Sequence, residues 1–372
     1  MNSVKILHCA DVHIGAVEGF LGSLAESRRY ETLITFEKIV DTALQNSISL
    51  LLIAGDLFDS NDIPLSFVDK VFEKIASVPQ IKVVFCAGNH DPLNSSSPFK
   101  IRRLPENLYV LGCTDSVFTF DDIKTRVYGR SFEDVYLKGE ETFTQKVPND
   151  DYINILLQHG ELRNDLGSNY NSITPKFLKN CQMDYVALGH VHKATPIGKI
   201  ENTSIAYCGC PEGQGFDELG EKGVYIGEVA KGNCDLQFLP MSHRKHIHEK
   251  IDITNVEDIY NYILTYLSEK FGENYASNLY KIELTGSINQ DFSINTTELA
   301  TRLSQTVYFA KVKDSTEFSV DFEAIANETT LKGVFVKNIL KKQAEAENPD
   351  LYKKALNLGL RAFNSEVKYN ED

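Results

Sequence analysis

Short apolar runs alternate with amphipathic segments over the first 245 residues of the chain. The runs are almost continuously apolar, as strands are when both faces of their sheet are covered. Residues 28–45 and 64–77 instead repeat apolar side chains at helical spacing and predict helices. We therefore expect an α/β domain with strands at residues 5–10, 50–54, 81–87, 153–157 and 185–188.

The pattern changes between Thr195 and Pro240, where short strand-like segments alternate with glycine-rich turns. This stretch shows no convincing helical period, which predicts a second and more antiparallel sheet. Together with the preceding elements, it indicates a layered α/β fold over residues 1–245, with two sheets flanked by helices.

The polar run SHRKHIHEK, residues 242–250, interrupts the pattern and marks a domain boundary. Its histidines, His243, His246 and His248, are more typical of an interdomain linker than of a metal site. A small α+β capping domain is predicted over residues 246–320. Its expected elements are a helix opened by the capping box Thr254-x-x-Glu257, a strand at 279–285, a helix opened by Asn295-x-x-Glu298 and a strand at 307–312.

Residues 321–372 form a predicted helical tail with two apolar stripes. Each large apolar side chain left in water costs about 1.5–3 kcal/mol, so both stripes need cover. They could fold back on the capping domain, but docking in a partner's groove is the preferred interpretation. The first stripe is Leu331, Phe335 and Ile339, and the second, after Asn348-Pro349, is Leu356, Leu360 and Phe363.

Composition and charge limit the classes of function. The chain has 42% hydrophobic and 24% charged residues, as ordinary soluble globular proteins do. Its N-terminus lacks the pattern of a signal peptide, and no apolar run reaches the roughly 18–20 residues of a membrane helix. We expect a cytoplasmic protein without membrane contact. A formal charge of −14 argues against adhesion to nucleic acid over the whole surface, but leaves room for a locally basic groove.

The seven cysteines are scattered, and several, such as Cys9 and Cys86, lie in strand-like runs. In a cytoplasmic chain we interpret them as reduced and buried. Cys208-Gly-Cys210 is the one close pair. It could form half of a zinc site, but the sequence offers no second C-x-x-C pair or matching histidine pair.

Five short polar segments each follow a predicted strand. In an α/β sheet the loops at the carboxyl ends of the strands line one crevice, so we expect these side chains to converge. Within each D-x-H or H-x-H pair, an extended backbone would point both side chains in the same direction. Glycines at 55, 88 and 189 would let the backbone turn sharply beside them. The segments are Asp11-Val12-His13, Gly55-Asp56, Gly88-Asn89-His90-Asp91, Gln158-His159-Gly160 and Gly189-His190-Val191-His192.

These side chains suit divalent metals such as manganese, iron or zinc, because they are imidazoles, carboxylates and one amide without a thiolate. A single histidine after a strand is more often structural, but five such segments in order favour a metal centre over coincidence. Seven candidate ligands suit two ions that share a bridging carboxylate and can activate water against a phosphate. They are Asp11, His13, Asp56, Asn89, His159, His190 and His192.

The ordered motifs D-x-H, G-D, G-N-H-D, H and G-H-x-H resemble those of the calcineurin-like metallophosphoesterases. The longer stretches HCADVHIGA, LLIAGDLFDS, CAGNHDP and ALGHVHK resemble the SbcD-type DNA repair nucleases, particularly their YhaO-like branch. The resemblance continues through residues 213–223 and NETTLKGVFVKNIL in the tail, and is strongest over the first 225 residues. It implies a hydrolase of phosphate esters that uses two divalent metal ions.

The resemblance also implies a role for each residue. His90 would lie over the scissile phosphate, stabilising charge or protonating the leaving oxygen, and would not be a ligand. Asp91 could orient His90 or act as a turn residue before Pro92. Asp59 stands where some relatives carry a histidine, which leaves the balance of exonuclease and endonuclease activity open. One ion would be held by Asp11, His13, Asp56 and His192, and the other by Asp56, Asn89, His159 and His190, with Asp56 as the bridge.

The resulting interpretation is a manganese-dependent DNA nuclease that processes double-strand breaks or hairpins. The resemblance implies an SbcC- or YhaN-like coiled-coil ATPase as the partner of the C-terminal helices, and it is compatible with a homodimer. Lys100, Arg102 and Arg103 could contact DNA phosphates or form a solvated surface. Two alternatives stay open. One is a phosphodiesterase for small nucleotides or other phosphoesters, which the charge of −14 favours; the other is a non-catalytic assembly factor for an ATPase complex, which the complete ligand set opposes.

Overall fold

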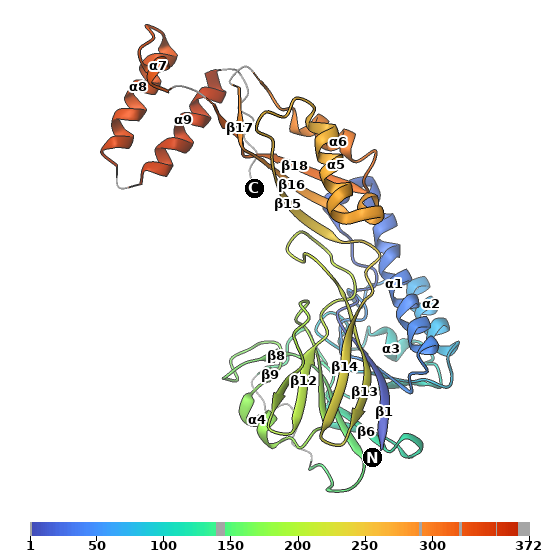
Figure 1. Ribbon diagram of the computed structural model, residues 1–372. Helices are drawn as coiled ribbons and strands as arrows, with labels where there is room; N and C mark the ends of the chain where they lie inside the picture. Colours follow the sequence, from blue (N-terminus) through green and yellow to red (C-terminus); the bar gives the residue numbers. More distant parts are fainter. Residues whose placement is uncertain (1, 139–145, 290–291, 320–321, 347, 364–372) are drawn as a thin grey trace. The chain divides into compact units, whose positions relative to one another are not determined.

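The computed structural model describes the chain except for residues 1, 139–145, 290–291, 320–321, 347 and 364–372 (Figure 1). The chain divides into two compact units, Met1–Lys245 and His246–Asp372. Each unit has hydrophobic core residues of its own.

The first unit contains two six-stranded sheets. In each sheet four neighbouring strands run parallel, and antiparallel strands complete the sheet at one or both edges. The first has the order β14 (Asn233–Pro240), β13 (Gly223–Ala230), β1 (Ser3–Cys9), β2 (Leu50–Ile53), β3 (Lys82–Phe85) and β4 (Leu108–Val110). The second has the order β11 (Gly198–Ile200), β12 (Thr203–Tyr207), β10 (Tyr185–Gly189), β7 (Ile153–His159), β6 (Thr125–Gly129) and β5 (Ser116–Phe120).

The two sheets pack face to face. Ile6 of the first sheet and Ile155 of the second belong to one fully buried cluster between them. Helices α1 (Ala25–Gln45) and α2 (Leu65–Ala76) cover the outer face of the first sheet (Figure 1), and α4 (Pro175–Asn180) packs on the outer face of the second. The short elements η1 (Gly19–Leu24), α3 (Pro98–Ile101), η2 (Asp121–Ile123), β8 (Glu161–Leu162) and β9 (Ser172–Ile173) lie in the connections. The predicted layered α/β fold is confirmed.

One polar contact crosses the buried space between the sheets. His8 on β1 and Tyr185 on β10 are both fully buried, and His8 Nδ1 lies 2.8 Å from Tyr185 Oη. Burial lowers the pKa of His8 to about 3, so the imidazole is neutral in the folded protein at ordinary pH. The pair therefore joins the sheets without a buried charge.

The five predicted strands are present as β1, β2, β3, β7 and β10, each end within two residues of its expected position. The expectation for residues 195–240 was wrong in one respect, because their strands do not form a sheet of their own. β11 and β12 extend the second sheet, whereas β13 and β14 extend the first. The reason is that β13 is apolar on both faces. It presents Val224 and Ile226 to the core under the helices and Tyr225 and Val229 to the core between the sheets.

The second unit begins with a three-stranded parallel sheet of order β15-β16-β18. Ile263 of α5 and Leu303 of α6 are fully buried in the same core as Ile282 of the central strand. Its elements are β15 (His246–Asp252), α5 (Ile259–Phe271), η3 (Gly272–Ser277), β16 (Leu279–Thr285), β17 (Ser287–Ile288), α6 (Thr296–Leu303), β18 (Phe309–Asp314) and β19 (Glu317–Phe318).

Only one of the two predicted capping boxes starts a helix. The side chain of Asn295 accepts a hydrogen bond from the N–H three residues on, at 3.2 Å, and caps α6 as expected. The Thr254 hydroxyl instead accepts from the first N–H of β17 at 2.9 Å, and α5 begins after Asp258. Asn255 has a left-handed φ of 60°, so the backbone cannot enter a helix at Thr254.

The tail contains α7 (Phe322–Ala326), α8 (Leu331–Ala344) and α9 (Pro349–Phe363). Helices α8 and α9 pack closely, since a Cβ at Gly359 would lie 2.1 Å from the Phe335 ring. The expected first stripe is divided, because Phe335 and Ile339 pack against the core of the unit while Leu331 is 75% exposed. Val336, Leu356 and Leu360 are at most 1% exposed in that core.

Among the helices of the described residues, none combines the length and the apolar content that a membrane crossing requires.

Candidate metal centre

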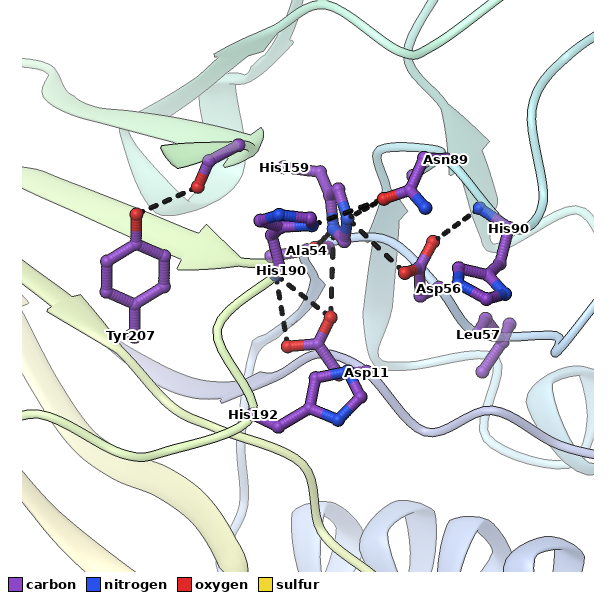
Figure 2. Close-up of polar contacts among 12 residues, drawn as sticks. Asp11, Ala54, Asp56, Leu57, Asn89, His90, His159, His190, His192 and Tyr207 are labelled. Carbon is purple, nitrogen blue, oxygen red and sulfur yellow. Dashed lines mark hydrogen bonds and ion pairs between the residues drawn. The ribbon is translucent and has the colours of Figure 1, made fainter. Parts of the chain in front are cut away.

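The seven predicted ligand residues come together at the carboxyl ends of the strands (Figure 2, which labels all but His13). The loops after β1, β2 and β3 of the first sheet carry four of them, and β7 and β10 of the second sheet lead to the other three. From the sequence we expected all these strands in one sheet. The centre instead lies where two facing sheets meet, and its members are Asp11, His13, Asp56, Asn89, His159, His190 and His192.

The backbone of Asp11 and His13 differs from the expected extended form. Their φ angles are 50° and 47°, in the left-handed region. Their N–H groups donate to the carbonyls of Gly55 and Asp56, each at 3.0 Å, so the loops after β1 and β2 hold each other. The side chains converge through this pairing of loops and not through the alternation of a strand.

Left-handed φ angles recur in the centre at Asp56 (49°) and His190 (97°). Residues other than glycine pay about 1–3 kcal/mol for sparsely populated backbone conformations, which persist where the surrounding structure enforces them and cluster at functional sites. Four such residues among seven ligand candidates indicate a site that the fold enforces.

The three glycines of the motifs are required mainly by close packing. Only Gly55 has a left-handed φ, 89°, so the expected sharp turn applies to this position alone. A Cβ at Gly55 would lie 2.3 Å from His159 Nδ1, one at Gly88 2.2 Å from Asp56 Oδ1, and one at Gly189 1.9 Å from a carbonyl oxygen of the first sheet. Any side chain at these positions would displace the ligand residues.

Asp11, His13 and His192 form one group whose ligand atoms lie within 4.8 Å of one another. His13 Nε2 lies 3.2 Å from His192 Nε2 and 3.8 Å from Asp56 Oδ2. Such separations suit ligands of a single ion with metal–nitrogen bonds of about 2.0–2.2 Å.

A second group surrounds Asn89 (Figure 2). Asn89 Oδ1 lies 3.0 Å from His159 Nε2 and 3.2 Å from His190 Nδ1. Asp56 Oδ2 lies 3.3 Å from His159 Nε2. Because Asp56 also faces His13, its carboxylate stands between the two groups, where a bridging ligand would stand.

His90 lies beside the ligand groups with an exposed side chain. Its N–H donates to Asp56 Oδ1 at 2.9 Å, and its Nδ1 lies 2.9 Å from the Asp59 carbonyl oxygen. The ring stands edge-on to that of His13, with centroids 4.7 Å apart. A ring nitrogen also comes within 4.8 Å of ligand atoms of His13 and Asp56, which makes the metal content of a His90 variant the decisive measurement.

Asp91 organises the loop that carries Asp56. Its carboxylate is fully buried, and burial, followed by the charge of Asp56, raises the pKa of Asp91 to about 6. Of the two roles considered for Asp91, the one in the turn matches its contacts, which are made to backbone groups and not to His90. It accepts from the N–H groups of Asp56 (3.2 Å), Leu57 (2.7 Å), Phe58 (3.2 Å) and Gly88 (2.8 Å).

The charges of Asp56 and His159 stabilise each other. Burial alone would raise the pKa of Asp56, but His159 and then His13 outweigh it, so the pKa lies well below its ordinary value. Burial alone would lower the pKa of His159, but Asp56 and then Asp11 raise it to about 9. The centre therefore holds an ionised carboxylate beside an imidazole that must give up a proton before it can bind a metal.

Every histidine of the ligand set has an acceptor at its other ring nitrogen. Such partners fix the tautomer and the ring orientation of a metal-binding imidazole. The acceptors are Asp59 for His13 (3.2 Å), the Ala54 carbonyl for His159 (2.9 Å), Glu161 for His190 (3.4 Å) and Glu218 for His192.

Two of these acceptors, Glu161 and Glu218, were not identified from the sequence. Glu161 lies two residues beyond His159 in β8, and Glu218 lies in the glycine-rich stretch of residues 213–223. The only local signal was an acidic residue in or near a loop, which is common on any protein surface.

The cysteine pair does not form half of a zinc site within the described chain. Cys208 is buried in the core between the sheets. The Cys210 thiol lies 3.5 Å from Glu218 Oε2, beside His192. Burial, and then the charge of Glu218, raises the pKa of Cys210 well above its ordinary value, so the thiol is a hydrogen-bond donor and not a thiolate ligand.

The other residues singled out from the sequence lie outside these groups. Lys100 and Arg103 are exposed, and Arg102 pairs with Asp69 at 3.0 Å. His243 lies 3.9 Å from Glu31, whereas His248 lies 3.9 Å from Glu283. In the part of the chain that the structure describes, these histidines share no group of metal-ligand atoms, in agreement with a linker.

The donor set fits divalent metal ions. It consists of four imidazoles, two carboxylates and one amide oxygen, with no thiolate. The ligand-type atoms fall into two groups that share Asp56, and the acceptors behind the histidines leave the inner nitrogens available to a metal.

The family model of the calcineurin-like phosphoesterases matches residues 4–194. The uncharacterized metallophosphoesterase YhaO of Bacillus subtilis is 26% identical over 276 residues, 70% of this chain and 65% of the relative. The DNA double-strand break repair protein Mre11 of Aeropyrum pernix is 28% identical over 275 residues, 69% and 66% of the two chains. One of the subunits of the nuclease SbcCD of Escherichia coli K12 is 24% identical over 276 residues, 63% and 66%. The chain thus spans slightly less than two thirds of the length of these relatives.

Proposed function

We propose, from the premise that the chain belongs to the calcineurin-like phosphoesterase family, that it is a two-metal nuclease that cleaves DNA phosphodiester bonds. Family membership makes it a metal-dependent hydrolase of phosphoester bonds. The observation that carries the finer proposal is the convergence of all seven ligand-type residues into two groups that share Asp56. DNA as the substrate is supported by relatives named as a nuclease and as double-strand break repair proteins.

The proposed ligand assignment follows the two groups. Bound divalent ions would supply an activated water and would neutralise charge on the phosphate. Asp91 keeps Asp56 between the groups through its bonds to the backbone of the Asp56 loop. One ion would be held by Asp11, His13, Asp56 and His192, and the other by Asp56, Asn89, His159 and His190.

His90 is the proposed catalytic residue. The Asp59 carbonyl engages Nδ1, which leaves Nε2 of this exposed ring to face a phosphate bound at the metal groups. As the oxygen of water forms its bond to phosphorus, the bond to the leaving sugar oxygen breaks. That oxygen takes the Nε2 proton, and the imidazolium stabilises the charge that develops before the transfer.

The metal we propose is manganese, because imidazole, carboxylate and amide ligands without thiolate suit it. We propose the cytoplasm as the compartment. The described cysteines support this placement, since all seven are free thiols and five of them are buried.

A phosphodiesterase for small nucleotides or other phosphoesters is the second candidate, because the formal charge of −14 disfavours a polyanionic substrate over most of the surface. The exposed cations Lys100 and Arg103, which follow the loop of Asn89 and His90, support DNA instead. A non-catalytic assembly factor is the third candidate. The completeness of the ligand set opposes it, since binding an ATPase requires none of these residues.

The proposed partner is an SbcC- or YhaN-like coiled-coil ATPase that docks on the tail helices. The apolar side chains available to a partner are not the expected Phe335 and Ile339, which pack inward. On α8 they are Leu331 and Val334, three positions apart and 75% and 54% exposed. On α9 they are Leu351 and Leu358, which are 60% and 54% exposed. Exposed apolar faces on amphipathic helices are typical of helix-in-groove docking.

A nuclease assay with manganese tests the proposed function. Hairpin, single-stranded and blunt duplex DNA are compared with a small aryl phosphodiester, and Asp56→Asn serves as the variant without the bridging carboxylate. We expect manganese-dependent cleavage of DNA by the wild type and none by the variant. Cleavage of the small phosphodiester alone would favour the second candidate, and bound manganese without any cleavage would favour the third.

A further inference from the structure

The three carboxylates behind the histidines differ in their exposure to solvent. The Glu218 side chain is 15% exposed, that of Glu161 29% and that of Asp59 38%. A hydrogen bond that is shielded from water is electrostatically stronger and holds its geometry better. Glu218 is therefore the carboxylate best placed to control the histidine in front of it.

Both carboxylate oxygens of Glu218 are engaged. Oε1 accepts a hydrogen bond from His192 Nδ1. Oε2 accepts from the backbone N–H of Gln214 at 2.9 Å and lies 3.5 Å from the Cys210 thiol. These contacts fix the carboxylate, and the carboxylate in turn fixes the His192 ring with Nε2 facing His13, 3.2 Å from its Nε2.

The loop that carries Glu218 is also fastened to the backbone of His192. The Cys210 N–H donates to the His192 carbonyl oxygen at 3.2 Å, and Lys222 Nζ donates to the same oxygen at 3.1 Å. Gly209 has a φ of 72°, and a Cβ there would lie 2.9 Å from that oxygen, so only glycine allows the approach. His192 and the Glu218 loop are thus held together by side chain and backbone.

The same loop is anchored to α1 through a buried ionic cluster. Glu212 accepts from Arg28 at 2.7 Å and from the Thr35 hydroxyl at 2.9 Å. The Arg28 side chain is 1% exposed and also pairs with Glu18 at 2.7 Å and Glu31 at 2.8 Å. The position of Glu218 therefore depends on buried contacts, which a fluctuation at the surface does not loosen.

We propose that Glu218 is a positioning residue that sets the metal affinity of the group formed by Asp11, His13 and His192. It does so by holding His192 in the tautomer and orientation that present Nε2 to the ion. This inference rests on the proposed two-metal function. Loss of such an outer partner typically costs about 10–100-fold in metal affinity. The second group depends on other acceptors, the Ala54 carbonyl and Glu161.

Calorimetric titration of the metal-free full chain with Mn²⁺, with bound ions counted by mass spectrometry, tests the proposal. We expect two ions in the wild type. Glu218→Gln, which keeps the shape of the side chain, should bind one ion with wild-type affinity and the other about 10–100-fold more weakly. Glu161→Gln, behind His190, should weaken the other ion instead. Glu221→Gln is the matched control from the same loop, because Glu221 is exposed and pairs with Lys245, and it should change neither ion.

The outcomes separate the two proposals. A wild type that binds no Mn²⁺ would overturn the two-metal function, and the role of Glu218 with it. Two tight ions in Glu218→Gln would overturn the positioning role alone. Equal weakening of both ions together with a lowered melting temperature would also overturn it, because Glu218 would then only support the fold.

Discussion

The backbone N–H of His190 donates to both carboxylate oxygens of Asp11, at 2.9 and 3.1 Å, although the two residues are 179 positions apart (Figure 2). This contact joins the loop after β1 in the first sheet to the loop after β10 in the second. Asp11 is fully buried and also faces His13 and His192 in the first ligand group. One carboxylate thus closes the gap between the sheets and offers an oxygen to a metal.

Replacing Asp11 by asparagine should separate these two tasks. The amide oxygen can still accept from His190, so the melting temperature should change little. The anionic ligand is lost, and manganese in the first group should bind at least about tenfold more weakly, a change of about 1.4 kcal/mol. Metal analysis of the purified variant checks this, and two tightly bound ions would contradict the assignment of Asp11 as a ligand.

His90→Ala should retain its metal ions and lose most turnover. A well-placed acid or charge-stabilising group is worth about 10²–10⁴ in rate. The variant is compared with the wild type in both manganese content and cleavage rate, with Asp56→Asn as the control that should lose both. If His90→Ala lost an ion, His90 would be a ligand and the proposed proton donor would have to be sought elsewhere.

Arg28→Ala should be strongly destabilising. The substitution leaves Glu18, Glu31 and Glu212 buried without their common cation, and breaking such a buried network costs about 3–5 kcal/mol. Urea unfolding measures the loss. Lys74→Ala, which removes a partly exposed pair with Asp41, is the control and should cost no more than about 1 kcal/mol. Equal effects of the two substitutions would mean that the buried cluster contributes no special stability.

His8 should make the stability of the first unit fall in mildly acidic solution. Burial lowers its pKa to about 3, whereas an unfolded histidine has a pKa of about 6.5. Between these values the unfolded chain binds more protons, so stability falls as the pH falls below 6.5, by about 2 kcal/mol at pH 5.

The variant His8→Gln can still pair with the Tyr185 hydroxyl but cannot titrate. Its free energy of unfolding in urea should therefore decrease less than that of the wild type between pH 7 and pH 5. Parallel curves for the two proteins over this range would show that His8 is not the titrating group.

Partner binding through the tail is best tested with point substitutions. Deleting the tail would also remove Val336, Leu356 and Leu360 from the core of the second unit. Leu331→Asp combined with Val334→Asp should abolish binding to an SbcC- or YhaN-like ATPase in a pull-down and leave manganese-dependent cleavage intact. Leu44→Asp, at a leucine of α1 that is 43% exposed, is the matched control. Retained binding by the double variant would mean that these side chains do not form the docking surface.

Much of the fold and of the candidate site could be predicted from the sequence because local pattern carries that information. A strand covered on both faces needs an apolar side chain at nearly every position, and the runs at β1, β2, β3, β7 and β10 met this condition. The ligand-type residues were recognisable because metal chemistry restricts the residue types and the topology restricts them to strand ends. The structure brings the seven residues so identified together.

Only the tertiary structure decided which sheet β13 joins, how the backbone of Asp11 and His13 turns, and which carboxylates lie behind the histidines. Each depends on a partner that is distant in the sequence. β13 pairs with β1, the Asp11 loop leans on the loop of Asp56, and Glu218 reaches His192 from another loop. An acidic residue in a glycine-rich loop has the same local pattern whether it faces solvent or a buried imidazole. Its role is therefore set by long-range packing, which the order of neighbouring residues does not encode.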